Sequence, residues 1–498
     1  MLRLLSFCVL AIAGVLTFTA CGEDFLARQP IDEVSVDGFF DSEESISLAT
    51  DAIYSTLQTQ GWHGQSFELD DVPSDDAAKN FDQGIDNFAA NPNNGNILNY
   101  WEAHYRTITY ANVVLEKSAE SELPDTTTAP YIAEARFLRG ISYFNLVRIF
   151  GGVPIVTEIP LLERDLLPAR ATVDETYQFL IADLEAAMAE LPSEHNPARA
   201  TKEAAQAYLA NVHLTLASRG NALGSFARAE ELARAVLESG HFEMLDDYGD
   251  LWIYPTSENS TESIFEIQYT GCGPWGTGNQ RQAFFAPFNQ GITGNSDGWG
   301  VMLPSAPPTE PVGTTSLDVW EEGDVRRYWS LFEPENFYEV INPDKGGYKY
   351  PKAGVGGRPA NIKKFVMGGG ADVCFMSTPQ NASIMRITEV ALIYAEALAR
   401  QRGGATVDGL AVDYFNRIRT RAGLEEKLLL ELDDIELERR REFMFEGKRW
   451  FDILRKGDRA AVSHMRLAGR TLTEEKLLFP IPALELEVNP NLEQNPGY

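Results

Sequence analysis

Two pairs of adjacent acids, Asp70–Asp71 and Asp75–Asp76, could take part in catalysis or bind a cation. A pair of carboxylates can act as acid and nucleophile in glycoside hydrolysis, and clustered carboxylates can bind calcium. The chain lacks EF-hand spacing, and adjacent acids in a protein with a formal net charge of −31 are usually solvated. We therefore interpret both pairs as surface groups, although the sequence leaves open whether calcium binds in the acidic loops.

Other patterns that predict catalysis or cofactor binding are missing from the sequence. The six histidines show no paired spacing typical of zinc ligands, and no nucleophile elbow or phosphate-binding glycine loop is present. The four cysteines are Cys8, Cys21, Cys272 and Cys374. The sequence alone does not decide whether Cys272 and Cys374 form a disulfide. We expect no metal site and no cofactor.

Residues 438–457, "ERRREFMFEGKRWFDILRKG", hold seven basic groups against four acidic ones. Such a stretch could contact nucleic acid, but a surface this acidic overall repels phosphate backbones. On a helix, Phe443, Gly447, Phe451 and Leu454 would share one side, and the charges would pair at spacings of three or four residues. We therefore predict a buried structural helix with locally paired charges, and no nucleic-acid partner.

Several segments have the apolar periodicity of amphipathic helices. They are residues 46–57, 99–118 and 131–150, and a helix headed by the capping-box pair Thr172 and Glu175 that ends near Leu191. Residues 204–240 and 389–423 each predict a helix, a polar turn and a second helix. Helix pairs of this length are typical of tetratricopeptide-like repeats, which bury a face only against their neighbours.

The middle of the chain has a different composition. Residues 271–370 contain 18 of the 40 glycines and show no sustained helical period. A segment this long without regular structure usually carries function or contains short strands, and residues 262–269 alternate as a strand does. The predicted fold is mostly α, with a helical frame over 41–240 and 380–498 and a loop-rich face over 241–379 and 61–98.

The N-terminus has the pattern of an export signal. Arg3 precedes an apolar run of about 16 residues, which is shorter than the roughly 20 that span a bilayer. "FTAC" (18–21) resembles the lipobox of bacterial lipoproteins, in which the cysteine is acylated after cleavage. We expect a signal peptide over 1–20 and a single mature domain over 21–498 with a lipid on Cys21; plain secretion with an incidental Cys21 is the alternative.

Five segments, in order, resemble the SusD/RagB family of outer-membrane lipoproteins. They are "ARFLRGISYFNLVRIFGGVPIV" (135–156), "GDVRRYW" (323–329), "RITEVALIYAEALA" (386–399), "RRREFMFEGKRWFDILRKGD" (439–458) and "LLFPIPALELEVNPNLEQNPGY" (477–498). The resemblance implies a tetratricopeptide-based, non-catalytic protein anchored by lipid on the cell surface. It also implies two partners: a SusC-like TonB-dependent transporter, and an oligosaccharide or, in some branches, a peptide.

The resemblance places the ligand on the loops after the first helix and on the long middle segment. Sugar rings stack on exposed aromatic faces, while amide, carboxylate and guanidinium groups bind their hydroxyls. The candidate contacts in these loops are Trp62, Asp76, Asn80, Trp275, Asn279, Arg281, Asp297 and Trp299. Each tryptophan could instead fill the core beneath its loop, because tryptophan is mostly buried on average.

Two other classes of function remain possible on the sequence alone. The chain could be a secreted, α-helical glycoside hydrolase that uses two of its carboxylates, or a scaffold whose helical repeats hold protein partners. Product formation from oligosaccharides would identify the first, and a co-purifying partner without ligand binding would identify the second. The identity of the glycan or peptide cannot be read from the sequence.

Overall fold

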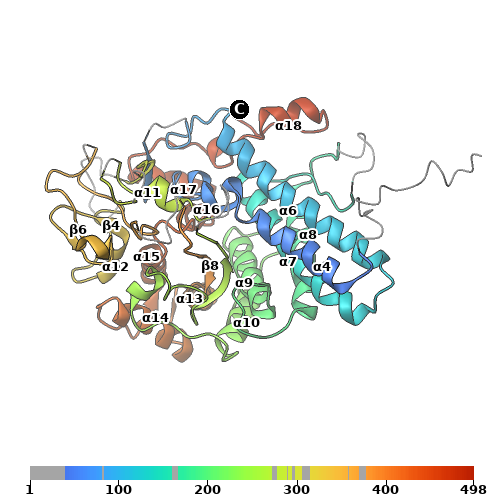
Figure 1. Cartoon of the computed structure of the whole chain (residues 1–498), viewed down its shortest axis with the longest axis horizontal. Coiled ribbons are helices and arrows are strands. Elements are labelled where there is room, and N and C mark those ends of the chain that lie inside the picture. The colour runs from blue at the N-terminus through green and yellow to red at the C-terminus, as the bar shows by residue number, and fades with distance from the viewer. Residues whose placement is uncertain are drawn as a thin grey trace, which may run out of the picture.

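The computed structural model describes residues 40–80, 84–159, 167–271, 278–288, 290–293, 298–305, 315–356, 358–369 and 377–498. Long helices of the N-terminal half lie side by side at one end of the molecule, and the short strands β4 (Leu331–Phe332) and β6 (Tyr348–Lys349) lie at the other (Figure 1). Within these ranges, no helix combines the length and apolarity that crossing a bilayer requires.

The N-terminal half is a series of antiparallel helices. They are α4 (Glu43–Thr56), α5 (Phe67–Asp70), α6 (Gly95–Glu120), α7 (Asp125–Phe150), α8 (Val173–Glu190), α9 (Lys202–Ser218) and α10 (Phe226–Leu237), with a π-helical turn, η1 (Gln60–Gly64). The predicted capping box is present, because the Thr172 hydroxyl accepts from Glu175 N–H and the Glu175 carboxylate accepts from Thr172 N–H. Gly140 lets α7 approach α8 closely: a Cβ there would lie 2.9 Å from Leu184 Cγ.

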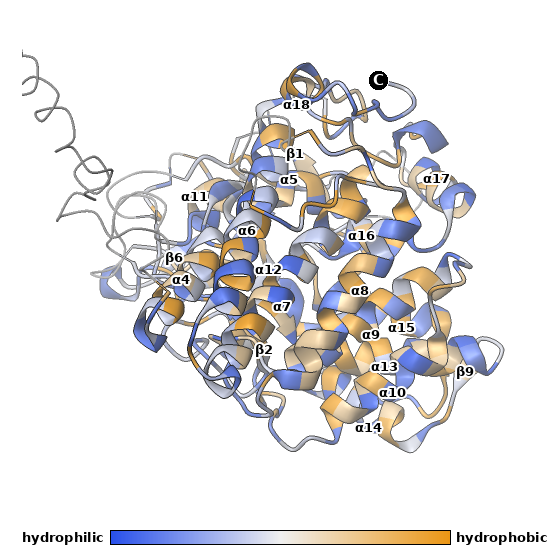
Figure 2. Ribbon diagram, turned by 90° about the vertical axis from the view of Figure 1, so that its right-hand side faces the viewer, coloured by the Kyte–Doolittle hydropathy of each residue, from blue (hydrophilic) through white to orange (hydrophobic). Residues whose placement is uncertain are grey.

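The C-terminal helices continue this frame. They are α13 (Ile387–Gln401), α14 (Gly409–Arg421), α15 (Leu432–Glu442), α16 (Arg449–Leu454), α17 (Asp458–Leu467) and α18 (Ala483–Val488). The two segments predicted as helix pairs form α9–α10 and α13–α14, and α10 packs directly against α13. Both α9 and α13 are mainly apolar (Figure 2) and almost wholly buried. The tetratricopeptide-like architecture is therefore confirmed.

The middle segment contains short elements where the sequence shows no helical period. They are β2 (Ser263–Ile267), α11 (Arg281–Phe285), β3 (Met302–Pro304), α12 (Val325–Ser330), β4 (Leu331–Phe332), β5 (Phe337–Tyr338), β6 (Tyr348–Lys349) and β7 (Asn361–Ile362). Outside the segment lie β1 (Ala77–Lys79), β8 (Ala382–Arg386), β9 (Ala405–Thr406) and β10 (Leu430–Glu431). The described strands pair antiparallel in twos: β1–β3, β2–β8, β4–β7, β5–β6 and β9–β10.

The basic stretch is not one helix, so this part of the prediction is wrong. Helix α15 ends at Glu442 and α16 begins at Arg449. The turn between them contains Phe445, with φ of 64°, and Gly447, with φ of 73°. Positive φ is the left-handed region that glycine enters without strain. Gly447 is therefore needed for a turn rather than for close packing inside a helix.

The charges of this stretch are buried and mostly pair with distant segments. Glu442 Oε1 and Oε2 accept from Arg421 at 2.5 Å, Arg386 at 2.9 Å and Arg326 at 3.2 Å, and all four side chains are nearly inaccessible. Burial alone would raise the pKa of Glu442, but the three guanidinium groups hold this pKa well below its usual range. The inference that the basic groups serve packing is correct, although most of their partners are not the neighbouring residues that were predicted.

One of the predicted local pairs does form. Asp452 lies 3.4 Å from Arg455, as the spacing indicates, but Arg439 binds Asp452 at 2.9 Å and Glu389 at 2.7 Å. Arg449 does not bind Glu446; its guanidinium lies 2.7 Å from Asp75. This stretch therefore connects the C-terminal helices to α13 and to the loop after α5.

Candidate ligand-binding surface

The two loop regions predicted to hold the ligand lie against each other. Strand β1 pairs with β3 so that Ala78 faces Leu303, and the backbone N–H of Asn80 donates to Val301 O at 2.8 Å. This pairing places Asn80 opposite Val301, two residues from Trp299, although more than two hundred residues separate them in the sequence. Of the predicted contacts that are described, these two keep solvent-accessible side chains.

Trp299 is held so that part of its indole remains open. Its backbone N–H donates to Ala283 O at 2.6 Å, and its ring packs edge-on against Phe284 with 4.7 Å between centroids. The side chains of Trp299 and Asn80 are both partly accessible to solvent. An accessible aromatic face with an amide nearby suits a sugar ring and its hydroxyls.

Three further residues beside Trp299 were not predicted. Phe288 is 63% exposed and its backbone bridges Gly298, next to Trp299. Gln290 donates to Phe288 O and accepts from the Tyr348 hydroxyl at 3.2 Å. The sequence signal that could have found them is an aromatic residue among Pro, Asn and Gly, as in "PFNQG" and "GGYKY". We call Asn80, Phe288, Gln290, Trp299 and Tyr348 the Trp299 surface.

Trp62 and Arg281 are buried, at 5% and 4% exposure. The indole of Trp62 lies against His104 at 5.2 Å between ring centroids, and Arg281 donates to His63 O and Ser66 Oγ. Both line a small, partly open cavity of about 70 Å³. In this structure Trp62 offers no open stacking face, because its ring packs beneath the loop.

Asn279 and Asp76 are also buried and bound within the protein. Asn279 Oδ1 accepts from Arg281 N–H and its Nδ2 donates to Gln380 O, both at 3.0 Å, so it joins α11 to the segment before β8. Asp76 binds Arg440 at 2.7 Å. These side chains are not open to solvent.

Three of the four acids, Asp71, Asp75 and Asp76, are buried and only Asp70 is partly exposed, which corrects the sequence interpretation. Asp75 is bound by Arg449, Arg440 and His464, at 2.7, 3.2 and 2.8 Å. Burial opposes ionisation, but Arg440 and Arg449 hold the pKa of Asp75 well below its usual value. A carboxylate fixed in this way is not placed to attack or protonate a bound sugar. Within the described part of the chain, no group of three or more His, Cys, Asp or Glu side chains could hold a metal ion.

The remaining predicted residues lie outside the described residues. They are Trp275, Asp297, the lipidation candidate Cys21, and the two cysteines Cys272 and Cys374. Their roles stay predictions.

The fold and this surface define a class of protein: a frame of stacked helical hairpins that presents a loop-built, aromatic and amide-bearing surface. Residues 24–214 match the family described as "Starch-binding associating with outer membrane", and residues 261–498 match the SusD family. The chain therefore belongs to the SusD/RagB family.

Individual relatives resemble the chain over most of its length. A SusD-like protein of Bacteroides ovatus is 29% identical over 454 residues, covering 88% of this chain and 80% of the relative. SusD-like protein P2 of Formosa agariphila is 28% identical over 528 residues, covering 98% of both chains. A crystal structure described as containing a xylogluco-oligosaccharide superimposes with a TM-score of 0.77 at 26% identity, covering 89% of this chain and 97% of the other.

Proposed function

We propose that this protein is a cell-surface lipoprotein that captures an oligosaccharide at the Trp299 surface and delivers it, unmodified, to a SusC-like TonB-dependent transporter. The observation that carries this proposal is the partly exposed indole of Trp299, close along the β1–β3 pairing to the partly exposed Asn80, on a chain whose family is described as starch-binding. A structural relative is described with a xylogluco-oligosaccharide.

The chemistry of the surface favours capture over hydrolysis. A sugar ring stacked on Trp299 would gain a contact of about 1–2 kcal/mol from the aromatic face, with hydroxyls bound by Asn80 and Gln290. The Asp75–Asp76 pair, which a hydrolase would need in the open, is buried under ion pairs with Arg440 and Arg449. Binding without turnover is therefore the expected activity.

Delivery and anchoring rest on the N-terminal pattern and on the family. The lipobox-like "FTAC" would place a lipid on Cys21 and hold the protein at the outer membrane. The family description associates its members with that membrane. A transporter partner follows from the resemblance.

The experiment is a calorimetric titration of the protein lacking residues 1–21 with xylogluco-, laminari- and malto-oligosaccharides, followed by chromatography of the same mixtures after prolonged incubation. We expect saturable binding of at least one series and no new products. Products that accumulate with time would contradict capture and favour a hydrolase. If the protein binds no glycan but binds oligopeptides, the ligand is a peptide.

A further inference from the structure

A second cavity lies between the N-terminal helices and the C-terminal segment, and none of its lining residues belongs to the Trp299 surface. Its volume is about 410 Å³, and it is lined by α7, α8 and α9 on one side and by α16, α17 and residues 474–478 on the other. Small-molecule sites usually have roughly 300–1,000 Å³. The cavity is therefore large enough for a small organic ligand.

Much of the wall is apolar. The side chains that form it are Val147, Val173, Leu216, Phe451, Leu477 and Leu478. Burying a ligand's hydrocarbon on such a wall contributes about 25 cal/mol per Å² of apolar area.

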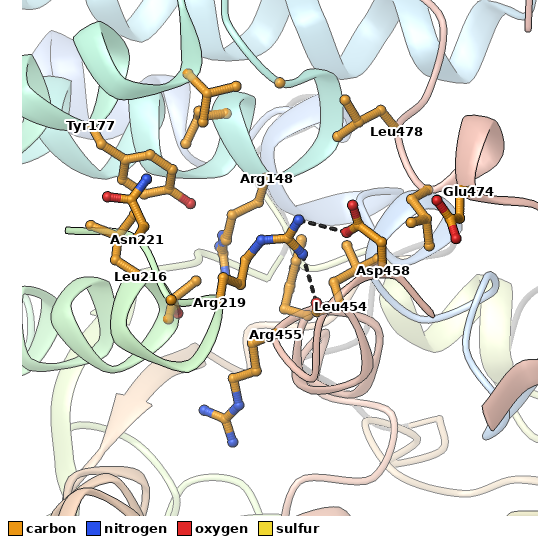
Figure 3. Close-up of a pocket in the computed structure, with 17 residues that line it drawn as sticks. Arg148, Tyr177, Leu216, Arg219, Asn221, Leu454, Arg455, Asp458, Glu474 and Leu478 are labelled. Atoms are coloured by element: carbon orange, nitrogen blue, oxygen red, sulfur yellow. Dashed lines mark hydrogen bonds and ion pairs between the residues drawn. The ribbon is translucent and has the colours of Figure 1, made fainter. Parts of the chain in front are cut away.

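Two of the three arginines that line the cavity are already neutralised. Arg219 donates to Leu454 O at 2.7 Å and to Asp458 at 2.6 Å, as the dashed lines in Figure 3 mark. Arg455 binds Glu396 at 2.6 Å, and its guanidinium is directed away from the other two. Neither cation needs a ligand.

Arg148 differs from the other two. Its guanidinium lies between the rings of Phe144 and Phe451, 3.9 and 3.7 Å from their centroids, and it donates to Phe144 O and Asn145 Oδ1. Among the described residues, no carboxylate lies within 4.0 Å of it. Asp70 lines the cavity of about 70 Å³ together with Arg148, and its carboxylate interacts electrostatically with the guanidinium from more than 4.0 Å away. The two rings fix this half-buried cation in place.

Tyr177 supplies a second polar group. Its side chain is 6% exposed, and within the described ranges its hydroxyl has no hydrogen-bond partner. Figure 3 shows this hydroxyl directed toward Arg148. Burial raises the pKa of Tyr177 to about 12, so the group remains a proton donor at neutral pH.

We propose that this cavity binds an amphipathic organic monocarboxylate. The carboxylate accepts hydrogen bonds from the guanidinium of Arg148 and the hydroxyl of Tyr177, and the apolar body lies on Leu216, Phe451 and Leu478. Because no carboxylate of the described residues lies within 4.0 Å of Arg148, a ligand carboxylate can supply its close partner, and charge-assisted hydrogen bonds are the strongest of their kind. The carboxylate can belong to a free acid or to the C-terminal residue of a peptide.

The test is calorimetric titration of the protein with 3-phenylpropionate and with its uncharged analogue 3-phenylpropanol. We expect saturable binding of the acid, and binding weaker by about tenfold for the alcohol and for the Arg148→Gln and Tyr177→Phe variants. Arg459→Gln, which changes a side chain that is 95% exposed, is the matched control and should bind as the unaltered protein does. Tyr177→Phe and Leu216→Trp, which fills the cavity, test the site if Arg148→Gln fails to fold.

A second arm distinguishes the sources of the carboxylate. N-acetyl-Gly-Phe and its amide are titrated in the same way. Preference for the free peptide acid over 3-phenylpropionate assigns the site to peptide C-termini, whereas binding of 3-phenylpropionate alone assigns it to free acids. The proposal is overturned if neither acid binds saturably below about 10 mM, if the alcohol binds as well as the acid, or if Leu216→Trp leaves binding unchanged. Glycan binding at the Trp299 surface is independent of these outcomes.

Discussion

Arg440 and Asp76 lie 2.7 Å apart in the interior, although 364 positions separate them in the sequence. Arg440 also lies 3.2 Å from Asp75, which Arg449 binds in turn. These contacts join the C-terminal helices to the loop that leads into β1, and β1 carries the strand pairing that places Asn80 close to Trp299. A buried ion-pair cluster therefore supports the candidate ligand surface.

Removing Arg440 should strongly destabilise the protein. The Arg440→Leu variant leaves Asp75 and Asp76 buried with one cation fewer, and breaking a buried pair in this way costs about 3–5 kcal/mol. The free energy of unfolding, measured by urea denaturation, checks this. Arg459→Gln is the control, because its exposed side chain lies 3.8 Å from Glu474, and it should leave the unfolding curve unchanged. Equal stability of the two variants would contradict the role given to Arg440.

The contribution of Asp71 to the free energy of unfolding should decrease as pH rises. Burial raises the pKa of Asp70 to about 6 and of Asp71 to about 7. Because these values exceed the unfolded value of about 3.9, the folded protein retains protons that the unfolded chain releases. The resulting stabilisation is complete below about pH 4 and is lost as pH rises through the folded pKa values.

The Asp71→Asn variant isolates this effect. Its Oδ1 can still accept from Gly447 N–H, as Asp71 does at 2.9 Å, but the group no longer titrates. The unfolding free energy of the variant relative to the original protein should increase between pH 5 and pH 7, with a slope of up to about 1.4 kcal/mol per pH unit. A difference that does not change with pH, measured by urea denaturation at several pH values, would contradict the raised pKa of Asp71.

Gly447→Ala should destabilise the turn between α15 and α16. Gly447 has φ of 73°, and a Cβ would lie 3.4 Å from Asp70 Cβ. A non-glycine residue in the left-handed region costs about 1–2 kcal/mol. Gly95→Ala, at the start of α6 with open space around it, is the matched control and should be neutral or slightly stabilising. Thermal unfolding of both variants gives the comparison, and a Gly447→Ala protein as stable as Gly95→Ala would refute the turn requirement.

Cys21→Ser should release the protein from the membrane fraction. Without a thiol no lipid can be attached, and the apolar signal segment is too short to span a bilayer. Fractionation of cells that express each form, followed by immunoblotting, measures the distribution. Ser6→Ala, a change within the signal segment that keeps the thiol, serves as the control. Retention of the Cys21→Ser protein with the membranes would show that another feature anchors it.

The sequence predicts the helical frame because apolar spacing and caps are local properties. The stripe that includes Ile46 and Ile53 became α4, and Thr172 with Glu175 capped α8. The prediction failed at residues 443–448, because Gly447 in a charged, amphipathic stretch is compatible with both a helix and a turn. The turn packs against Asp70, and the Gly447 N–H donates to Asp71 Oδ1; these tertiary contacts favour a turn over a helix.

The candidate site was less predictable, because burial depends on partners that are distant in the sequence. Adjacent acids resemble a solvated loop until Arg440 and Arg449 are placed beside them. Trp62 and Trp299 both stand among polar and glycine residues, yet His104 covers one and the other stays half-open. Phe288 and Tyr348 lie outside the predicted set, because the bridge to Gly298 and the hydrogen bond to Gln290 that place them at this surface are tertiary contacts.

The most direct test of glycan capture compares oligosaccharide affinity in two single variants. Trp299→Ala removes the proposed stacking face, and Tyr110→Ala removes an aromatic ring that is 41% exposed on α6. Titration with the best-bound oligosaccharide should show that Trp299→Ala weakens the affinity by about tenfold. The affinity of Tyr110→Ala should be unchanged, and both proteins should be folded. Equal affinity in the two variants would contradict the claim that the Trp299 surface binds the ligand.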